Sequence, residues 1–369
     1  MSYPWIIVGL ILIAAALAIY LLLHSDSAKN IFGLFVDDAD QKTPDIDDVA
    51  KSTNLPSVVK ATPVSSGVHS LSLNQPVAHS EKFDASSAPP YPVDEVVLLN
   101  VNSLPKTWAC LRGSVKGFNK QELQDAHEVV ISGDNVALLV CDGAGSKKHS
   151  KAGADLVVTH LKEKLVVLFE TSKRLDAANW RKIAEETLLS AVEKLSALAN
   201  EQGNQLSDYG CTAIVAVATR DYVFCAHVGD GRAGYLDAKG VFRSMMTPFK
   251  GAEANATVFV TMLTAENIAD RLRTFELKLH SRALMALSDG PEQVCWHTST
   301  LDKSGTRLTD PNVPSAKFFG KIAHQFASAT ASKTPQDELN AKWAEFLTSG
   351  NPSLATEVDD KTLLFALRA

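Results

Sequence analysis

The sequence has few cysteines and no motif that would pair them. Five Cys occur among 369 residues, an odd number, and there is no C-x-x-C pattern. Such a set argues against a disulfide-stapled fold and against a Cys-based zinc site. Cys141, Cys211 and Cys225 lie in apolar runs, which is typical of buried core thiols, and no Cys/His pairing indicates thiol catalysis.

A block of like charge is also missing. The 36 Lys and Arg and 42 Asp and Glu give a net charge of −6, with neither sign concentrated in one large block. Without a basic face, the chain is not expected to bind nucleic acid. The remaining composition, 46% hydrophobic and 21% charged, is ordinary for a globular protein and excludes disorder throughout. The length predicts about two domains.

One apolar segment near the N-terminus contains no charge at all. Pro4–Leu23 reads PWIIVGLILIAAALAIYLLL, and a helix of this length spans about 30 Å, the thickness of the hydrocarbon core of a bilayer. Trp5 and Tyr20 lie near its ends, where interfacial aromatic residues are common. A cleaved signal peptide is the alternative, but it would have a basic n-region and a shorter apolar core. We therefore expect a transmembrane anchor within residues 1–30.

The segment after the anchor has the composition of a tether. Lys29 is the nearest basic residue, so the positive-inside rule favours a single-pass protein of the cytoplasmic membrane with its C-terminal side in the cytoplasm. Residues 31–94 are rich in Ser, Thr, Pro, Asp and Ala without a sustained period, which predicts a flexible linker. The folded domain is then expected over residues 95–369.

The pattern of residues 95–369 indicates sheets covered by helices. Strand-like runs occur at Val136–Cys141, Ala213–Thr219, Tyr222–Val228, Arg282–Leu287 and Val358–Leu367. Helical stretches occur at Gly153–Glu170, Ala178–Gln202 and Asp337–Thr348. Because strands follow one another directly as well as flanking helices, the order favours packed sheets with helices outside over an alternating βαβ fold.

Aspartates stand at the ends of several of these apolar strands. They occur in VALLVCDGAGS (Asp142), FCAHVGDGRAGYL (Asp230), RALMALSDGPE (Asp289) and TEVDDKTLLFAL (Asp359 and Asp360), with LQDA (Asp125) as a further candidate. Taken singly, each is most often a turn residue. If the strand ends converge, the carboxylates raise one another's pKa, and bound divalent cations remove that penalty. Oxygen ligands select Mg²⁺ or Mn²⁺, and two such ions can clamp a phosphate ester, so the residues predict a two-metal phosphohydrolase.

Seven motifs in order also resemble a known family. They are GSVKGFNKQELQDA, CDGAGSKKHSKAGA, DYGCTAIVAVA, VGDGRAGYL, PFKGAEANATVFVT, LSDGPE and DDKTLLFAL, spread from about Gly113 to Leu367. Together they resemble the metal-dependent type-2C protein Ser/Thr phosphatases, most of all the bacterial branch written with DGAGS. The resemblance implies an α+β fold: a four-layer αββα sandwich of two antiparallel sheets flanked by helices, with a metal site in a cleft at one end.

The resemblance also implies which residues hold metal. Asp142 would bridge two ions, and the Gly143 carbonyl would bind the first. Asp289 and Asp359 would bind the second, and Asp230 would serve a third, weaker site. The implied cofactor is two or three Mn²⁺ or Mg²⁺ ions. The implied reaction is hydrolysis of phosphoserine or phosphothreonine by a water that the metals activate, without a phosphoenzyme.

Three further site residues follow from the resemblance. Asp125 would be the outer-sphere carboxylate that orders water. Asp360 would cap or pack, with metal binding in place of Asp359 as the alternative. Lys120 stands where many members have the Arg that holds phosphate, and Lys offers a point charge without the bidentate contact. Lys147 and Lys148 form a small basic loop beside the metal motif; it is expected to be solvated, with contact to a phosphate or an acidic substrate as the alternative.

Other positions depart from the family pattern. Ala144 replaces a His that is the suspected general acid in eukaryotic relatives, and His149 is a nearby substitute, although a solvated loop His is the simpler interpretation. Gly231 replaces the usual Ser of the Gly-Asp-Ser-Arg motif, and Arg232 is expected to be structural. His227 stands where Asn is common and is expected to be a core residue.

Three hypotheses for the function remain open. The first is a membrane-anchored bacterial protein Ser/Thr phosphatase that acts on phosphorylated proteins and reverses a cognate kinase, its tether raising the effective concentration of membrane-proximal substrates. The second is a catalytically weak or inactive phosphatase-like module that binds or scaffolds partners. The third is a related hydrolase of small phosphoesters.

Overall fold

The computed structural model describes residues 95–171, 175–249, 257–301 and 308–369. The predicted anchor at 1–30 and the predicted linker at 31–94 lie outside these ranges. Within them, no helix combines the length and the apolar character needed to cross a bilayer.

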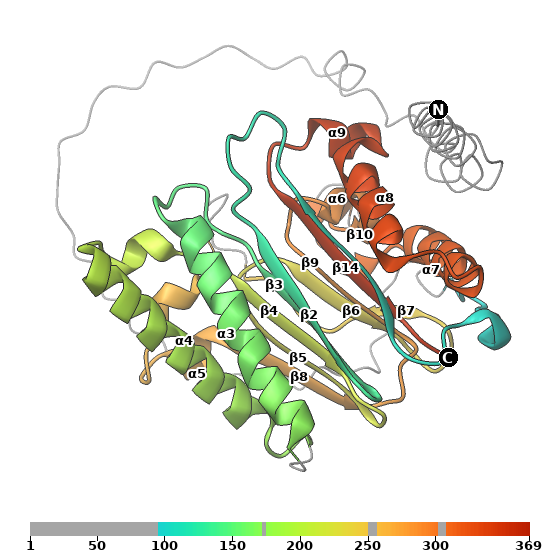
Figure 1. The fold of residues 1–369 in the computed structure, drawn as a ribbon, viewed down its shortest axis with the longest axis horizontal. Coiled ribbons are helices and arrows are strands. Elements are labelled where there is room, and N and C mark those ends of the chain that lie inside the picture. The colour runs from blue at the N-terminus through green and yellow to red at the C-terminus, as the bar shows by residue number, and fades with distance from the viewer. Residues whose placement is uncertain (1–94, 172–174, 250–256, 302–307) are drawn as a thin grey trace, which may run out of the picture. The chain divides into compact units, whose positions relative to one another are not determined.

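Two five-stranded antiparallel sheets pack face to face (Figure 1). The first has the order β1-β14-β9-β6-β7, with the strands β1 (Ala109–Val115), β14 (Lys361–Leu367), β9 (Ala283–Leu287), β6 (Arg232–Leu236) and β7 (Phe242–Ser244). The second has the order β2-β3-β4-β5-β8, with the strands β2 (Ala126–Ser132), β3 (Asn135–Cys141), β4 (Ala213–Ala218), β5 (Tyr222–Val228) and β8 (Arg273–Lys278).

The central strands are apolar along their whole length because both of their faces are covered. In β3, Val136, Leu138 and Val140 point between the two sheets, whereas the alternate residues point to the helices outside. In β14, Leu364 and Ala366 point between the sheets, and their neighbours point to the other helical layer. A strand of period two therefore reads as a continuous apolar run in the sequence.

Helices cover the outer faces of both sheets (Figure 1). The long helices α3 (Ser150–Glu170) and α4 (Trp180–Gln202) lie over the second sheet, and α7 (Ala316–Ala331) and α8 (Gln336–Ser349) lie over the first. A buried tryptophan anchors a helix on each side: the Trp180 indole donates to the Cys225 carbonyl, and the Trp343 indole donates to the Leu363 carbonyl, both at 2.8 Å. These layers make an α+β sandwich of the predicted type.

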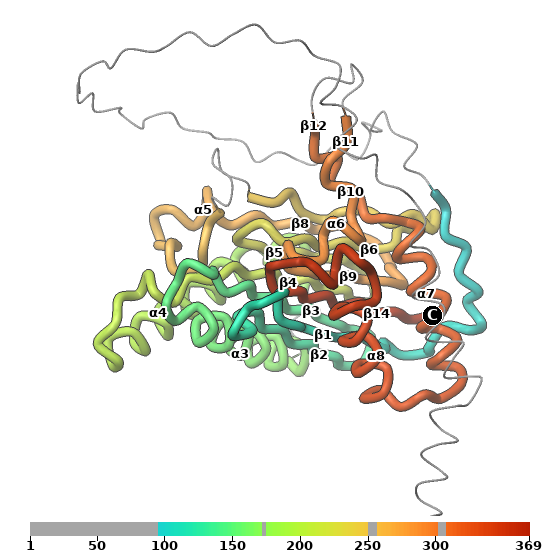
Figure 2. The backbone as a smooth tube through the Cα atoms, turned by 90° about the horizontal axis from the view of Figure 1, so that it is seen from above, coloured from blue at the N-terminus to red at the C-terminus, as the bar shows by residue number. Residues whose placement is uncertain are grey.

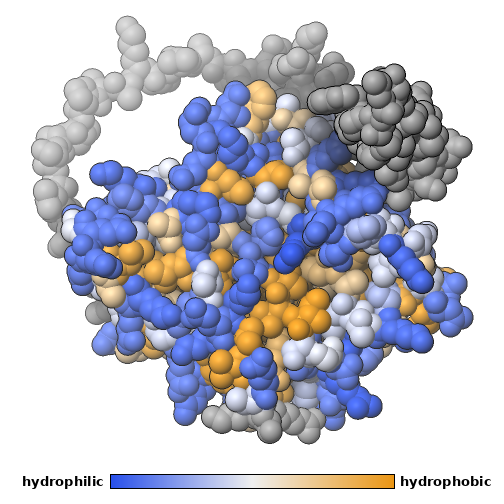
Figure 3. Space-filling view, in the orientation of Figure 1, coloured by the Kyte–Doolittle hydropathy of each residue, from blue (hydrophilic) through white to orange (hydrophobic). Residues whose placement is uncertain are grey.

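Short elements complete the chain. They are η2 (Val101–Ser103), η3 (Leu206–Tyr209), η4 (Val260–Met262), α5 (Ile268–Arg271), α6 (Glu292–Cys295), α9 (Pro352–Thr356), and the two-stranded pairs β10 (Trp296–His297) with β13 (Val313–Pro314) and β11 (Thr300–Leu301) with β12 (Leu308–Thr309). Figure 2 shows the β11 and β12 pair projecting from the rest of the fold. On the face drawn in Figure 3, apolar side chains gather in the bands beside α3, where the helices leave the sheets uncovered.

Most predicted elements are present with shifted ends. The helix predicted from Gly153 begins at Ser150, and the one predicted from Ala178 begins at Trp180. The last strand is predicted from Val358 but begins at Lys361, which pairs with Val115, the last residue of the neighbouring strand β1. The pattern did not predict β1, β2, β6, β8 or α7, which are less uniformly apolar or are broken by Gly and Ser.

Candidate active site

The strand ends bring five aspartates to one end of the sandwich. Asp142 directly follows β3, and Asp125 directly precedes β2, which pairs antiparallel with β3. Asp289 follows β9, and Asp359 lies just before β14, which pairs antiparallel with β9. Asp230 lies in the turn between β5 and β6. The convergence expected from the sequence is therefore a consequence of the two antiparallel sheets.

These carboxylates are close enough to change one another's ionisation. Burial, and then the nearby carboxylates of Asp125, Asp289, Asp359 and Asp230, raise the pKa of Asp142 well above its ordinary value. Burial and its acidic neighbours raise the pKa of Asp289 to about 7. The cluster is therefore a concentration of negative charge that a cation would stabilise.

Two glycines allow the carboxylate loops to touch. A Cβ atom on Gly290, in the turn after β9, would lie 2.1 Å from the Asp360 carbonyl oxygen. A Cβ atom on Gly117, in the loop between β1 and β2, would lie 2.1 Å from the Val358 carbonyl oxygen. Only a residue without a side chain fits at either position, so the two glycines set how closely the loops of Asp289 and Asp359 approach.

Asp125 is buried and held at one oxygen. Its Oδ2 accepts hydrogen bonds from the Thr362 hydroxyl at 2.7 Å and from the Ser288 hydroxyl at 2.8 Å, whereas its Oδ1 is buried without a partner. Burial raises the pKa of Asp125 to about 6, against the opposing effect of these two hydrogen bonds. The Oδ1 of Asp289 is buried without a partner as well. Each of these two carboxylates therefore keeps one acceptor for a group that the polypeptide does not provide.

Lys120 and Asp360 link the loops around this cluster. Asp360 is 1% exposed and accepts hydrogen bonds from the backbone N–H groups of Gly117 at 2.9 Å and Gln124 at 2.6 Å, which confirms the predicted capping role. The Lys120 ammonium forms an ion pair with Asp359 and lies 3.4 Å from the Asp360 carboxylate. Lys120 is thus at the site, and in this structure its partners are carboxylates.

The donor set fits hard divalent cations. It consists of carboxylate oxygens, two of them orphaned and buried, beside the Gly143 backbone, and oxygen donors select Mg²⁺ or Mn²⁺. Among the described residues, no three His, Cys, Asp or Glu side chains converge on a single metal position. Mg²⁺ usually keeps several waters and takes only one or two carboxylates, so a cluster of three is not required. Asp359, which pairs with Lys120, would have to exchange that partner for a metal.

Three other predicted positions have structural roles or contacts. His149 stacks on Tyr209 with ring centroids 5.2 Å apart, and its buried Nε2 has no partner, so the expectation of a solvated loop histidine was wrong. Ala144 donates its backbone N–H to the Gly210 carbonyl. His227 is 2% exposed, and burial lowers its pKa to about 3, as expected of a core histidine. Lys148 is exposed in its loop.

Arg232 confirms its predicted structural role. Its side chain is fully buried and donates to Glu292 at 2.8 Å, to Asp310 at 2.8 Å and to Asn312 at 2.7 Å. Glu292 lies one turn after Asp289, so the guanidinium ties the start of β6 to the segment that follows this aspartate. Arg232 therefore stabilises the segment that follows Asp289 and does not itself form the aspartate cluster.

The sequence patterns did not single out the side chains that hold Asp125. Ser288 and Thr362 stand next to predicted ligand motifs, in LSDGPE and DDKTLL, but a hydroxyl beside an Asp carries no distinctive signal. Their role depends on β9 and β14 being neighbours, where the Thr362 N–H also donates to the Ser288 hydroxyl at 3.1 Å. Only the sheet order shows this.

Comparison with known families agrees with the metal-binding chemistry that the aspartate cluster indicates. The model of the family described as Protein phosphatase 2C matches residues 112–347. The chain belongs to the protein phosphatase 2C family. The matched range contains Lys120, Asp125, Asp142, Asp230 and Asp289, and it ends before Asp359. Membership confirms the resemblance seen in the motifs and makes the chain a member of a family of metal-dependent phosphoprotein phosphatases.

Solved structures of several phosphatases are similar to this protein phosphatase 2C chain. Serine/threonine phosphatase Stp1 from Staphylococcus aureus is 15% identical with a TM-score of 0.45, and the match covers 72% of this chain and 97% of Stp1. PppA from Pseudomonas aeruginosa is 14% identical with a TM-score of 0.46, covering 72% and 99%. The catalytic domain of PstP, solved in complex with 2 manganese ions, is 14% identical with a TM-score of 0.44, covering 71% and 98%. A search of curated protein sequences returned no match.

Proposed function

We propose that this chain hydrolyses phosphoserine and phosphothreonine in proteins, with two divalent cations held at the aspartate cluster. Asp142 would be shared by the two ions, the Gly143 carbonyl would help to hold the first, and Asp289 and Asp359 would hold the second. Asp230 serves a third, weaker site. The observation that carries this proposal is the cluster itself: carboxylates from both sheets raise one another's pKa at one end of the sandwich. Repulsion between the carboxylates destabilises the folded protein, and bound cations would offset it, so such a cluster indicates a cation-binding site.

The chemistry needs both the cations and the surrounding side chains. When bound, Mn²⁺ or Mg²⁺ would lower the pKa of a water and neutralise the charge of the phosphate. Asp125 offers its free Oδ1 to the water that attacks phosphorus, because its Oδ2 is held by Ser288 and Thr362. Lys120 supplies a positive charge, which pairs with Asp359 here and would be available to a phosphate held by the cations at this cluster.

The proposal also includes a membrane location, based on the N-terminal segment. Residues 1–30 form the single-pass anchor, residues 31–94 form the tether, and the phosphatase domain faces the cytoplasm. The support is the uncharged apolar run Pro4–Leu23, with Lys29 on its C-terminal side. The tether would confine turnover to phosphoproteins near the membrane, which are the products of a cognate Ser/Thr kinase.

A metal-dependence assay tests the proposal. The protein would be assayed on a phosphothreonine peptide with Mn²⁺, with Mg²⁺ and with chelator, beside Asp142→Asn, Asp289→Asn and the surface control Asp155→Asn, whose side chain is 52% exposed. We expect turnover that needs the cation, falls at least about 100-fold in the first two variants and is unchanged in the third. A folded protein that binds Mn²⁺ but hydrolyses no phosphopeptide would contradict the proposal and favour a binding module.

A further inference from the structure

A chain of short hydrogen bonds leads from the site into the interior. The Thr362 hydroxyl donates to Asp125, and the Ser114 hydroxyl lies 2.6 Å from that of Thr362. The same Ser114 oxygen lies 2.6 Å from the Nδ1 atom of His127. The chain joins β1, β14 and β2, so it crosses from the first sheet to the second.

The carboxylate fixes the direction of every bond in this chain. An ionised Asp125 can only accept hydrogen bonds, so the Thr362 hydroxyl donates its single proton to the carboxylate. The Thr362 oxygen must then accept a hydrogen bond from the Ser114 hydroxyl, which donates its own single proton to Thr362. Ser114 has no proton left for His127, so the imidazole Nδ1 must carry a hydrogen and donate it.

The chain also determines where the free oxygen of Asp125 points. With Oδ2 held by two hydroxyl groups, the carboxylate cannot rotate, and Oδ1 remains as its single unpartnered, buried acceptor. Ala126, which follows Asp125, pairs with Cys141, which precedes Asp142, so Asp125 lies beside the proposed metal site.

The surroundings of His127 keep its ring neutral. The side chain is half-buried, and its charged neighbours are Arg112 on β1 and Glu128 on its own strand. Burial, followed by the Arg112 charge, lowers the pKa of His127 to about 4, which the Glu128 charge only partly opposes. A neutral ring has one N–H, so the tautomer is a definite property of the folded protein.

We propose that Ser114 and His127 are positioning residues of the phosphatase, which hold Thr362 and thereby aim the free Oδ1 of Asp125 at the reacting water. This inference rests on the proposed function. Neither residue touches the substrate; each acts through the next hydroxyl in the chain. The alternative is that these polar groups satisfy one another in a crowded interior and have no influence on turnover.

The first test reads the chain without turnover. Histidine-labelled full-length protein would be examined by ¹⁵N NMR, with His127→Gln used to assign the His127 signal. We expect His127 as the Nδ1–H tautomer in the wild type and a change of tautomer in Ser114→Ala, which lacks the acceptor. An Nε2–H tautomer in the wild type would overturn the inference, whether or not the protein proves to be a phosphatase.

The second test measures kinetics on a phosphothreonine peptide with Mn²⁺. We expect Ser114→Ala to lower kcat about 10- to 100-fold with KM unchanged, the range typical of a lost supporting hydrogen bond, and Ser114→Thr to restore most of it. Ser281→Ala is the matched control: it removes another fully buried serine hydroxyl, which binds the Leu236 and Ala283 carbonyls before β9, at the end away from the site. Equal kcat values for Ser114→Ala and wild type would overturn the inference.

Discussion

At the scale of single residues, Lys120 has the contacts that most directly concern the proposed metal site. Its side chain is 22% exposed, and its ammonium pairs with Asp359, a proposed ligand, while also approaching the buried Asp360. An ammonium and a divalent cation compete for the same carboxylate oxygens. Lys120 is therefore expected to neutralise the ligand carboxylates when no metal is bound and to offer a positive charge to the phosphate when metal is bound.

Removing the Lys120 charge should strengthen metal binding. We expect Lys120→Met to tighten Mn²⁺ binding up to about 5-fold, because a partly exposed ion pair of this kind is worth up to about 1 kcal/mol. Isothermal titration calorimetry measures this directly. Lys120→Arg keeps the charge, and Lys116→Met removes a charge from the same loop, so both should bind like the wild type. Weaker Mn²⁺ binding in Lys120→Met would contradict the competition.

Residues of the site differ in how far the sequence alone reveals them. Asp142, Asp230 and Asp289 each follow an apolar strand and precede Gly, and this recurrence made them candidates. Asp360 is predicted to cap, and its carboxylate accepts hydrogen bonds from the loop before β2. Asp359 is predicted to bind metal. The chain through Ser114 and His127 could not be predicted, because it depends on which strands are neighbours.

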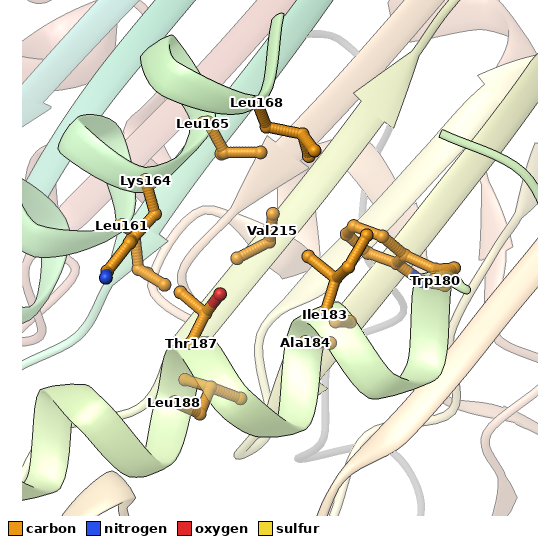
Figure 4. Close-up of a pocket in the computed structure, with 11 residues that line it drawn as sticks. Leu161, Lys164, Leu165, Leu168, Trp180, Ile183, Ala184, Thr187, Leu188 and Val215 are labelled. Carbon is orange, nitrogen blue, oxygen red and sulfur yellow. The ribbon is translucent and has the colours of Figure 1, made fainter. Parts of the chain in front are cut away.

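At the scale of elements, the packing of α3 and α4 on the second sheet leaves a small apolar cavity. Its volume is about 30 Å³, and its walls are side chains of both helices and of β4 and β5, with Leu161, Trp180, Leu188 and Val215 among them (Figure 4). Leu188 is 1% exposed, so it contributes fully to this contact. The cavity lies under the helices and away from the aspartate cluster.

Enlarging this cavity should cost stability without affecting chemistry. We expect Leu188→Ala to lower the free energy of unfolding by about 3 kcal/mol, since the truncation removes buried contacts and adds to existing empty space. Urea denaturation would measure the loss, and kcat for the folded protein should be unchanged. Leu98→Ala is the control, because Leu98 is 82% exposed and its truncation should change stability by less than about 0.5 kcal/mol. Equal stabilities of the two variants would contradict this packing.

Elements were predictable where burial is uniform and less so elsewhere. The strand β3 and the helix α4 follow from apolar runs and from a stripe at helical spacing. In contrast, β1 contains Arg and Gly within ACLRGSV, and β2 carries His and Glu. Both are edge strands of their sheets, so several of their residues are exposed or half-buried. The sequence signal is therefore weakest at the edges of the sheets, where burial is incomplete.

At the scale of the whole molecule, the aspartate cluster should make the metal-free protein less stable at higher pH. The folded pKa values of Asp142, Asp125 and Asp289 are raised, to about 6 for Asp125 and about 7 for Asp289. A group with a raised folded pKa contributes its full stability below the unfolded value, about 4, and loses it as pH rises through the folded value. The contribution of Asp125 and Asp289 should therefore be lost between about pH 4 and pH 7.

Scanning calorimetry with chelator tests this pH dependence. We expect the Tm of the wild type to fall relative to that of Asp142→Asn, which removes one repelling charge, between pH 5 and pH 8, and to recover at pH 8 on adding Mn²⁺. The comparison with this variant is needed because the lowered pKa values of His127 and His227 act in the opposite direction in both proteins. An exposed substitution, Asp155→Asn, should leave the profile of the wild type in place. A Tm difference between the wild type and Asp142→Asn that does not change from pH 5 to pH 8 would contradict the raised pKa values.

The placement of cations at the cluster is the central claim, and anomalous scattering from crystals grown with Mn²⁺ tests it most directly. The account predicts two anomalous peaks about 3.5–4 Å apart, one on each side of the Asp142 carboxylate, with Asp289 and Asp359 at the second. Lys120 should then have left Asp359. A crystal with Mn²⁺ in the solution but no peak at Asp142, and the Lys120–Asp359 ion pair intact, would contradict it.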